Sequence, residues 1–366
     1  MTSVEGQGLY AFAAMPAPEV SVVIPTRNRW ELLSRNSLAS ALAQVGVELE
    51  VIVVDDASDD GSDERLEAVS DPRVRTIFRE RQGGQAVALN DGIEAARGEW
   101  IAFLDDDDLW SPRKLRAQLD ATGPRAQFVY GSMVAVDTSG NVLEAVPTPP
   151  PADVRRLLRR HNVLRCPSSV MARAAFVRKV GGLDVSLNEL TDWDFFIRLA
   201  DAGRCAACQE IVVGYLVHPQ NRRLRQDSDV ETEFRYLAAK HERGLPLERA
   251  GFARWVAMGH LRAGRKRAAL STYLRSAVRD HDLGNAVRAG AAVFGEGVFR
   301  ARRKVAADRP EVPWLDGFAA AEDGDHRGGV ARVEAPLEED ERSDEEDGSR
   351  GDGEPEGATE RDHRDA

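Results

Sequence analysis

The stretch WIAFLDDDDLW at residues 100–110 places five apolar residues directly before four consecutive aspartates. A short apolar run that ends in polar residues is typical of a buried strand, which we expect at residues 100–104. Repulsion among adjacent carboxylates favours a nearby cation. Mg²⁺ and Mn²⁺ prefer such oxygen ligands and complete their shell with phosphate oxygens and water. The stretch predicts a divalent-cation site; the plainer alternative is an acidic turn that caps a helix near Pro112, for which one acid would suffice.

Apolar strands and helical segments alternate ahead of this stretch. Further strands are expected at 20–24, 49–54 and 74–78, and helices at 29–44 and 85–97. Such alternation predicts an α/β fold with a mainly parallel central sheet flanked by helices. Ligands of such sheets bind beyond the carboxyl ends of the strands. Those ends carry Pro25-Thr26-Arg27, Asp55-Asp56 and Asp105 to Asp108.

The following hundred residues hold two further candidates. A strand pair is expected within 126–136 and an arginine-rich helix at 153–161. Asp192 precedes a predicted helix at 195–202, where a carboxylate suits a helix cap as well as a catalytic base. His218 follows an apolar run, and taken alone it is best interpreted as a polar surface residue, with a metal ligand or a phosphate contact as the alternatives.

Charge and composition divide the rest of the chain. Residues 251–306 read as helical and hold 12 Lys and Arg against 3 acids, which suits contact with anionic lipid, a solvated face or pairing with an acidic tail. Residues 322–366 hold 18 acids against 6 Arg in low-complexity order. The basic segment lacks the interleaved aromatics of a nucleic-acid platform, so nucleic acid is not an expected partner. The expected units are an N-terminal extension (1–18), a catalytic domain (19–220), a basic helical appendage (221–306) and a disordered acidic tail (307–366).

The cysteines and the lengths of the apolar runs indicate the cellular compartment in which the protein is expected. Cys166, Cys205 and Cys208 cannot all pair, and the C-x-x-C spacing lacks the partners of a zinc site. The first 18 residues lack the basic region of a signal peptide, and no apolar run has the length of a membrane span. We expect a cytoplasmic protein with peripheral contact at the inner face of the plasma membrane.

Taken in order, these segments resemble the family 2 glycosyltransferases, which have the A-type, Rossmann-like fold for nucleotide-diphospho-sugars. The resemblance covers about residues 19–220. It rests on VSVVIPTRN (20–28), VIVVDDAS (51–58), ALNDGI (88–93), GEWIAFLDDDDLW (98–110), and GGLD (181–184) with DWDF (192–195) and Arg198. Each piece is weak alone, whereas the ordered set is specific.

The resemblance implies roles for individual residues. Asp107 would be the direct metal ligand for Mn²⁺ or Mg²⁺, and Asp192 would be the catalytic base. Thr191 stands where the family often has Glu, so Asp194 is a candidate to share the base role. The residues implied in nucleotide-sugar binding are Pro25, Thr26, Arg27, Asp56, Asn90, Asp105 and Asp106, and those implied in metal binding are Asp107, Asp105 and His218.

The implied reaction is metal-dependent, inverting transfer of a sugar from a nucleoside-diphosphate donor, with a UDP-sugar favoured, to a glycan or lipid-linked acceptor in cell-surface polysaccharide or glycoconjugate synthesis. A Gln-x-x-Arg-Trp element typical of processive members is absent from residues 220–224, which favours single additions. A nucleotidyltransferase would need a glycine-rich basic loop that residues 25–30 lack. The non-enzymatic alternative is a degenerate module that binds sugar nucleotides or polysaccharide.

Overall fold

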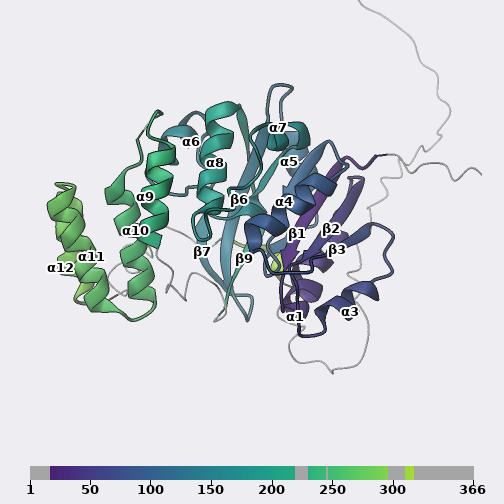
Figure 1. The fold of residues 1–366 in the computed structure, drawn as a ribbon, viewed down its shortest axis with the longest axis horizontal. Coiled ribbons are helices and arrows are strands. Elements are labelled where there is room, and N and C mark those ends of the chain that lie inside the picture. Colours follow the sequence, from purple (N-terminus) through teal and green to yellow (C-terminus); the bar gives the residue numbers. More distant parts are fainter. Residues whose placement is uncertain (1–16, 219–229, 245, 296–309, 317–366) are drawn as a thin grey trace, which may run out of the picture. The chain divides into compact units, whose positions relative to one another are not determined.

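A nine-stranded sheet organises the described part of the chain (Figure 1). The structure is a computed structural model that describes residues 17–218, 230–244, 246–295 and 310–316. The strand order is β3-β2-β1-β4-β8-β6-β9-β5, and β7 pairs with β6. The strands are β1 Val20–Thr26, β2 Leu49–Asp55, β3 Val74–Phe78, β4 Trp100–Phe103, β5 Leu109–Trp110, β6 Phe128–Asp137, β7 Val142–Val146, β8 Val170–Arg173 and β9 Cys205–Val217.

The sheet changes character along its width. β3, β2, β1 and β4 are parallel, as predicted, so the carboxyl ends of these strands lie at one edge. Beyond β4 the sheet is mixed, because β8 is antiparallel to both β4 and β6, and β5 is antiparallel to β9. The strand pair expected within residues 126–136 is instead a single strand, β6, whose antiparallel partner β7 follows a short turn. The α/β class with flanking helices is confirmed.

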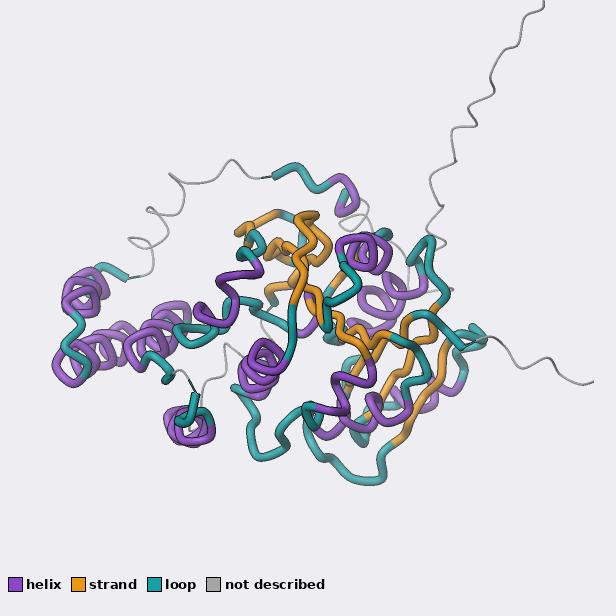
Figure 2. Tube along the Cα trace, turned by 90° about the horizontal axis from the view of Figure 1, so that it is seen from above, coloured by secondary structure: helices purple, strands orange, loops and turns teal. Residues whose placement is uncertain are grey.

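Helices cover both faces of this sheet (Figure 2). Neighbouring strand residues point to opposite faces, as Val22 and Val23 illustrate: Val23 packs with residues of α4, α7 and α8, whereas Val22 packs with residues of α1–α2 and α5. The helices are α1 Trp30–Leu32, α2 Ala39–Leu42, α3 Ser62–Glu67, α4 Gln85–Ala95, α5 Lys114–Ala121, α6 Pro151–Leu157, α7 Ala174–Lys179, α8 Thr191–Ala202, α9 Val230–Lys240, α10 Arg249–Arg262, α11 Lys266–Arg279 and α12 Leu283–Ala292.

The helix expected at 29–44 is interrupted. Residues Leu33–Leu38 between α1 and α2 form a π-helical turn. Such turns widen the helix and recur at functional sites. Here the wider turn brings Asn36 and Ser37 against the backbone of the aspartate run that follows β4.

The C-terminal helices begin as part of the main core. Phe234 of α9 lies 6.0 Å from Trp193 of α8 and stacks on Phe252 of α10, with ring centroids 4.0 Å apart. The remainder of α10 packs with α11 and α12 around a small core of its own. Helices were expected in this region and are present. Among the described residues, no helix is both long enough and apolar enough to cross a membrane.

Residues 310–316 differ from the expected disorder beyond residue 307. Val312 and Leu315 are buried against Leu109 and Leu216, and Pro313–Leu315 form a 3-10 turn. The indole N–H of Trp314 donates to the carbonyl of Ile211, at 3.2 Å. This segment therefore covers the β5–β9 edge of the sheet. The rest of the predicted tail, residues 1–16 of the N-terminal extension, and the 220–224 stretch lie outside the described residues.

Candidate active site

A cavity of about 420 Å³ lies at the carboxyl ends of β1, β2 and β4 and reaches the start of α8. A volume of this size suits a small organic ligand. The sequence predicted such a crevice because parallel strands end at the same sheet edge. The predicted site residues that line it are Pro25, Thr26, Arg27, Asp56, Asp105, Asp106, Asp107 and Asp192.

The four aspartates after β4 have different environments. The Asp105 carboxylate accepts a hydrogen bond from the Gln85 amide at 2.7 Å and faces the cavity. Asp108 is fully buried, and it accepts from the Ser168 hydroxyl at 2.5 Å and from the Leu216 N–H at 3.3 Å. Burial, followed by the charges of Asp107 and Asp105, raises the pKa of Asp108 well above its usual range. Asp108 therefore serves the fold, while Asp105 faces the ligand space.

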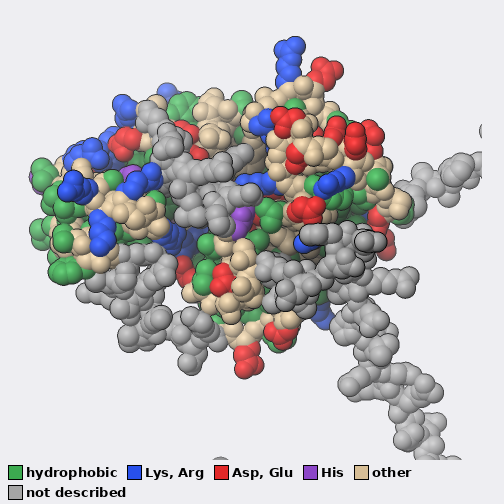
Figure 3. All heavy atoms as spheres, turned by 90° about the horizontal axis from the view of Figure 1, so that it is seen from below, with side chains coloured by type: hydrophobic (Ala, Val, Ile, Leu, Met, Phe, Trp, Pro, Cys, Tyr) green, Lys and Arg blue, Asp and Glu red, His purple; other side chains and the backbone are tan. Residues whose placement is uncertain are grey.

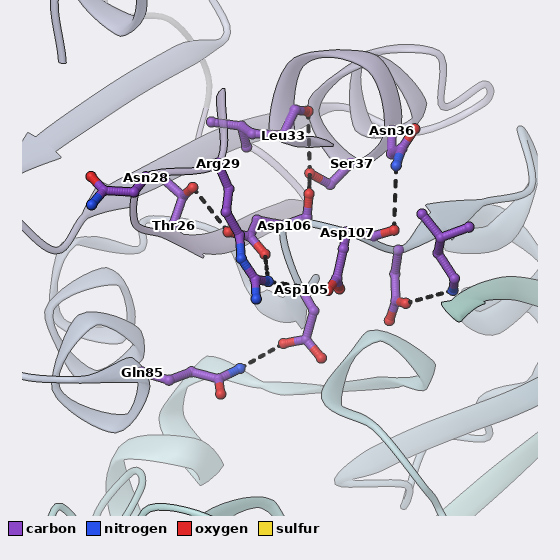
Figure 4. Close-up of polar contacts among 12 residues, drawn as sticks. Thr26, Asn28, Arg29, Leu33, Asn36, Ser37, Gln85, Asp105, Asp106 and Asp107 are labelled. Carbon is purple, nitrogen blue, oxygen red and sulfur yellow. Dashed lines mark hydrogen bonds and ion pairs between the residues drawn. The ribbon is translucent and has the colours of Figure 1, made fainter. Parts of the chain in front are cut away.

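Asp106 and Asp107 share one cation, Arg29 (Figure 4). The Arg29 Nη1 lies 3.0 Å from Asp106 Oδ1 and 3.1 Å from Asp107 Oδ2. The Thr26 hydroxyl donates to the other Asp106 oxygen, at 3.0 Å. Burial, together with the charge of Asp107 and against the charge of Arg29, raises the pKa of Asp106 to about 6. The positive charge of the Arg29 guanidinium therefore offsets part of the negative charge of the Asp106 and Asp107 carboxylates.

The backbone of the aspartate run is fixed by the π-helical turn. The Ser37 hydroxyl donates to the Asp106 carbonyl at 3.2 Å, and the Asn36 amide donates to the Asp107 carbonyl at 3.4 Å (Figure 4). All four residues of these two contacts are buried. Two main-chain carbonyls are thereby held while the carboxylates remain directed at the cavity.

The donor atoms here fit a divalent cation that arrives with a diphosphate. His218 is buried, and its Nε2 lies 3.0 Å from Asp107 Oδ2, so a nitrogen and an oxygen ligand are already adjacent. Among the described residues, no group of three or more His, Cys, Asp or Glu side chains is arranged as a preformed metal site. A Mg²⁺ or Mn²⁺ site completed by phosphate and water needs only one or two carboxylates, which Asp107 and Asp105 provide.

Asp56 organises the loop opposite the aspartates. Its two carboxylate oxygens accept from the N–H groups of Gly83 and Gly84, each at 2.7 Å, and the Arg79 Nε lies 3.0 Å away. Gly84 has φ +87°, a conformation that favours glycine. Asp56 also lines the cavity, so it forms part of one wall although both of its carboxylate oxygens accept hydrogen bonds from the protein.

Asn90, for which the resemblance implied donor binding, contacts the protein backbone next to the cavity-lining Leu183, and donor binding by Asn90 stays a prediction. Its amide N–H donates to the Leu183 carbonyl at 2.9 Å, and its amide oxygen accepts from the Leu183 N–H at 2.8 Å. A Cβ at Gly182 would lie 2.4 Å from this oxygen, so the glycine permits the close contact. Asn90 therefore ties α4 to the loop that leads to Asp192.

Asp192 lies in the first turn of α8 and borders the cavity. It is half-buried, accepts from the Asn162 amide at 2.8 Å, and accepts from the Trp193 N–H at 2.7 Å. A carboxylate in this position is stabilised by the positive end of the helix dipole. The N-cap residue of α8 is Leu190, so Asp192 is a first-turn carboxylate and not the helix cap, and its role as a base stays a prediction.

Asp194 does not share this position with Asp192, and a part for it in base catalysis stays a prediction. Its side chain is fully buried and does not line the cavity. Its carboxylate is 2.7 Å from Arg198 Nε, 3.0 Å from Lys240 Nζ and 2.8 Å from His241 Nε2. Against the effect of burial, the hydrogen bond from His241 and the charges of Arg198 and Lys240 lower the pKa of Asp194. Asp194 anchors α9 to α8.

Several site residues were missed in the sequence. Arg29 lies one residue beyond the quoted 20–28 motif, and only the fold brings it back over Asp106 and Asp107. Glu189 lines the cavity two residues before Thr191, so an acid is present near the site of the missing family Glu. Asn162, Gln85 and Ser168 reach the site from separate elements, and no spacing in the sequence marks them.

A family model for "Glycosyl transferase family 2" matches residues 21–181. This range includes the cavity's strand ends and the whole aspartate run. Residues 21–181 form a family 2 glycosyl transferase domain. The family predicted from the ordered motifs is thus the one whose model matches this range.

Similarity to individual proteins is partial. The succinoglycan biosynthesis protein ExoO of Rhizobium meliloti is 42% identical over 127 residues, which are 34% of this chain and 36% of that protein. An uncharacterized glycosyltransferase, alr2836, of Nostoc sp. is 28% identical over 63% of this chain and 73% of its own length. The chain spans between about a third and a half of the first curated relatives it matches.

Among solved structures, the mannosyltransferase PcManGT from Pyrobaculum calidifontis, in complex with GDP-Man and Mn²⁺, is similar with a TM-score of 0.49 and 21% identity. The likeness covers 76% of this chain and 81% of that one.

Proposed function

We propose that this chain transfers a sugar from a nucleoside-diphosphate sugar to an acceptor hydroxyl in the synthesis of a polysaccharide or other glycoconjugate. The observation that carries the proposal is that Asp107, at a strand end, and Asp192, at a helix start, line the same cavity. One suits the phosphate side of a donor and the other suits the acceptor side. The family 2 domain supports this class of reaction.

On the donor side, the nucleotide would lie between the β1 end and the loop held by Asp56. Pro25, Thr26 and Arg27 form the first of these walls, and uracil is the base we expect. Asp105, Asp107 and His218 would hold Mn²⁺ or Mg²⁺, and such an ion, when bound, stabilises negative charge on a leaving phosphate. If these three residues bind the ion, Arg29 must move away from Asp107. The Arg29 Nη1 lies 3.1 Å from Asp107 Oδ2, the same oxygen that His218 contacts.

On the acceptor side, Asp192 would accept the proton of the attacking hydroxyl. The N–H of Trp193 and the amide of Asn162 donate to its carboxylate and hold it in place. A positioned base of this kind contributes roughly 10²- to 10⁴-fold to a rate. Direct attack opposite the leaving diphosphate inverts the anomeric carbon and needs no covalent intermediate on the protein.

The second candidate is a module that binds sugar nucleotides without turnover. It is favoured by the replacement of the family Glu at Thr191, which lines the cavity but whose hydroxyl donates to the Leu187 carbonyl at 2.7 Å. Glu189 and Asp192 nevertheless both border the cavity. The two candidates therefore share donor binding and differ in turnover.

Donor binding is tested by isothermal titration with UDP, GDP, ADP, CDP and dTDP, each with and without Mn²⁺. We expect one nucleotide to bind, with uridine preferred, and binding to require the ion. With Asp107→Asn, adding Mn²⁺ should no longer strengthen nucleotide binding. With Asp63→Asn, which replaces an exposed acid on α3, Mn²⁺ should strengthen binding as it does in the wild type. Equal binding of all nucleotides in both variants would refute the assignment of the cavity.

A further inference from the structure

The outward faces of α11 and α12 carry large apolar side chains that no described residue covers. On α12 and the turn after it, Leu283, Val287 and Phe294 are 84%, 69% and 75% exposed. Their spacing, with Gly290 between the last two, is that of one face of a helix. On α11, Leu274 and Val278 repeat the pattern one turn apart. We call these five apolar residues the outer stripe.

The outer stripe is not the packing face of these helices. The packing face consists of Ala269 and Tyr273 on α11 and Ala289 and Ala292 on α12, which are buried together with residues of α10. The outer stripe lies on the opposite side of each helix, since its residues are offset by about half a turn from the buried ones. Both helices are therefore apolar on two sides. Single exposed apolar residues are ordinary, but a repeated stripe marks a surface that meets another phase or partner.

The charges around the stripe are mainly positive. Residues 249–295 hold nine Lys and Arg against two acids, and neither α11 nor α12 contains an Asp or Glu. Helices exposed only to water usually mix both signs, which gives favourable pairs along the surface. Arg267 and Arg275 lie on the exposed side of α11, and no described acid pairs with either. Figure 3 shows hydrophobic side chains with Lys and Arg beside them at the left of the view, where α11 and α12 lie.

We propose that α11 and α12 dock on a membrane surface of anionic lipid, with the outer stripe in the interfacial region and the neighbouring arginines on the headgroups. A bilayer interface supplies apolar contact and negative charge together, and helices with a strong apolar face and a cationic polar face bind it in this way. The acidic tail of this chain would satisfy the arginines but not the stripe, because residues 322–366 are dominated by acids and glycine. The surface thus fits lipid better than it fits the tail.

Vesicle co-sedimentation with the full chain tests the proposal, and it needs no sugar donor, so its outcome is independent of the proposed reaction. Vesicles of phosphatidylcholine alone are compared with vesicles of phosphatidylcholine and phosphatidylglycerol in equal parts. We expect binding only to the second kind, and weaker binding as salt is added. The double variant Val287→Glu with Phe294→Glu should lose roughly tenfold or more of this binding. Arg267→Gln and Arg275→Gln should each lose roughly fivefold.

Leu143→Glu is the matched control, because Leu143 is 49% exposed on β7 and lies outside this surface. It should bind vesicles as the wild type does, and circular dichroism should report the same helix content for all variants. No binding of the wild type to anionic vesicles overturns the proposal. A second result also overturns it: light scattering shows that the wild type is a dimer, and the double variant loses the dimer but still binds vesicles as the wild type does. The stripe would then be a contact between two copies of the chain.

Discussion

The Arg29 Nη1 lies 3.1 Å from Asp107 Oδ2, so a guanidinium occupies the carboxylate on which the proposed cation site depends. The same nitrogen contacts Asp106 at 3.0 Å. In the absence of metal, this cation offsets repulsion within the aspartate run. When a metal nucleotide binds, Arg29 has to release Asp107, and a free guanidinium beside a diphosphate is suited to contact its oxygens.

Replacing Arg29 with Met separates these two effects. Without metal, we expect the free energy of unfolding to fall by about 2 kcal/mol, because charge-assisted hydrogen bonds are lost and two carboxylates stay close together. The affinity for Mn²⁺ alone should rise by about tenfold, since no guanidinium competes. Denaturant titration in chelator and Mn²⁺ titration without nucleotide measure the two quantities. Unchanged Mn²⁺ affinity would show that Arg29 does not compete for the ion site; Arg35→Met, an exposed arginine on the same helical segment, is the control.

Asp192 and Asp194 should respond in opposite ways to replacement by Asn. Asp192→Asn is expected to keep the fold and donor binding while turnover falls by roughly 10²-fold or more. Asp194→Asn leaves Arg198, Lys240 and His241 without their carboxylate, so the free energy of unfolding should fall by about 3 kcal/mol or more. Thermal unfolding and donor titration on both variants distinguish the roles. A stable Asp194→Asn protein without turnover would support Asp194 as a base.

Lys114 is a buried amine with no hydrogen-bond partner among the described residues, and its Nζ lies 3.7 Å from the centroid of the Trp110 ring. Burial lowers the pKa of Lys114 well below its usual value. Between the folded and unfolded pKa values, the unfolded chain binds the additional proton, so stability should rise with pH by up to about 1.4 kcal/mol per unit.

Lys114→Met replaces the amine, which binds the additional proton in the unfolded chain, with an apolar side chain of similar volume. We expect the variant to be more stable than the wild type by about 1 to 2 kcal/mol at neutral pH, and the advantage to shrink as pH approaches the unfolded lysine pKa. Lys179→Met, at an exposed lysine, should be neutral. Urea unfolding across a pH series measures both. A destabilised Lys114→Met protein would mean that the amine makes a favourable interaction in the folded chain.

Asp184 links α9 to the loop before α8 and makes stability sensitive to acid. Against the effect of burial, hydrogen bonds from Lys240, the Ser186 N–H and Tyr236 lower the pKa of Asp184 to about 2. Because the folded pKa is depressed, this contribution is fully present above the unfolded value near 4 and is lost as pH falls through about 2. Lys240→Met should move the acid-unfolding midpoint upward, as followed by circular dichroism. A midpoint equal to that of Lys179→Met would contradict the link.

The parts of the fold that depend on local pattern were predictable from the sequence. The strands ending at Thr26, Asp55 and Phe103 were expected because apolar runs stop at polar residues, and parallel pairing then brings their ends to one edge. The mixed half of the sheet was not predictable in this way. Strand β8 follows a 3-10 turn at Pro167–Ser169 and pairs with β4 and β6, which are distant in sequence.

The same limit applies to the site. Asp105, Asp107 and Asp192 stand out in sequence because carboxylates at strand and helix ends are conspicuous. Arg29, Asn90 and Asp194 depend on tertiary partners: Asn90 turns out to bond Leu183, and Asp194 faces cations from a helix nearly fifty residues later. Sequence reasoning identified carboxylates, but which of them face the cavity is decided by packing.

The most direct test of the central claim is the release of nucleoside diphosphate from a panel of sugar nucleotides, with Mn²⁺ or Mg²⁺ and a mixture of glycan and lipid-linked acceptors. Wild type is compared with Asp107→Asn, Asp192→Asn and the control Asp63→Asn. The account predicts ion-dependent and acceptor-dependent release from one donor, retained in the control, lost in both site variants, and lost in Asp192→Asn without loss of donor binding. Donor binding by the wild type with no release across the panel, or equal release by wild type and Asp192→Asn, would contradict it.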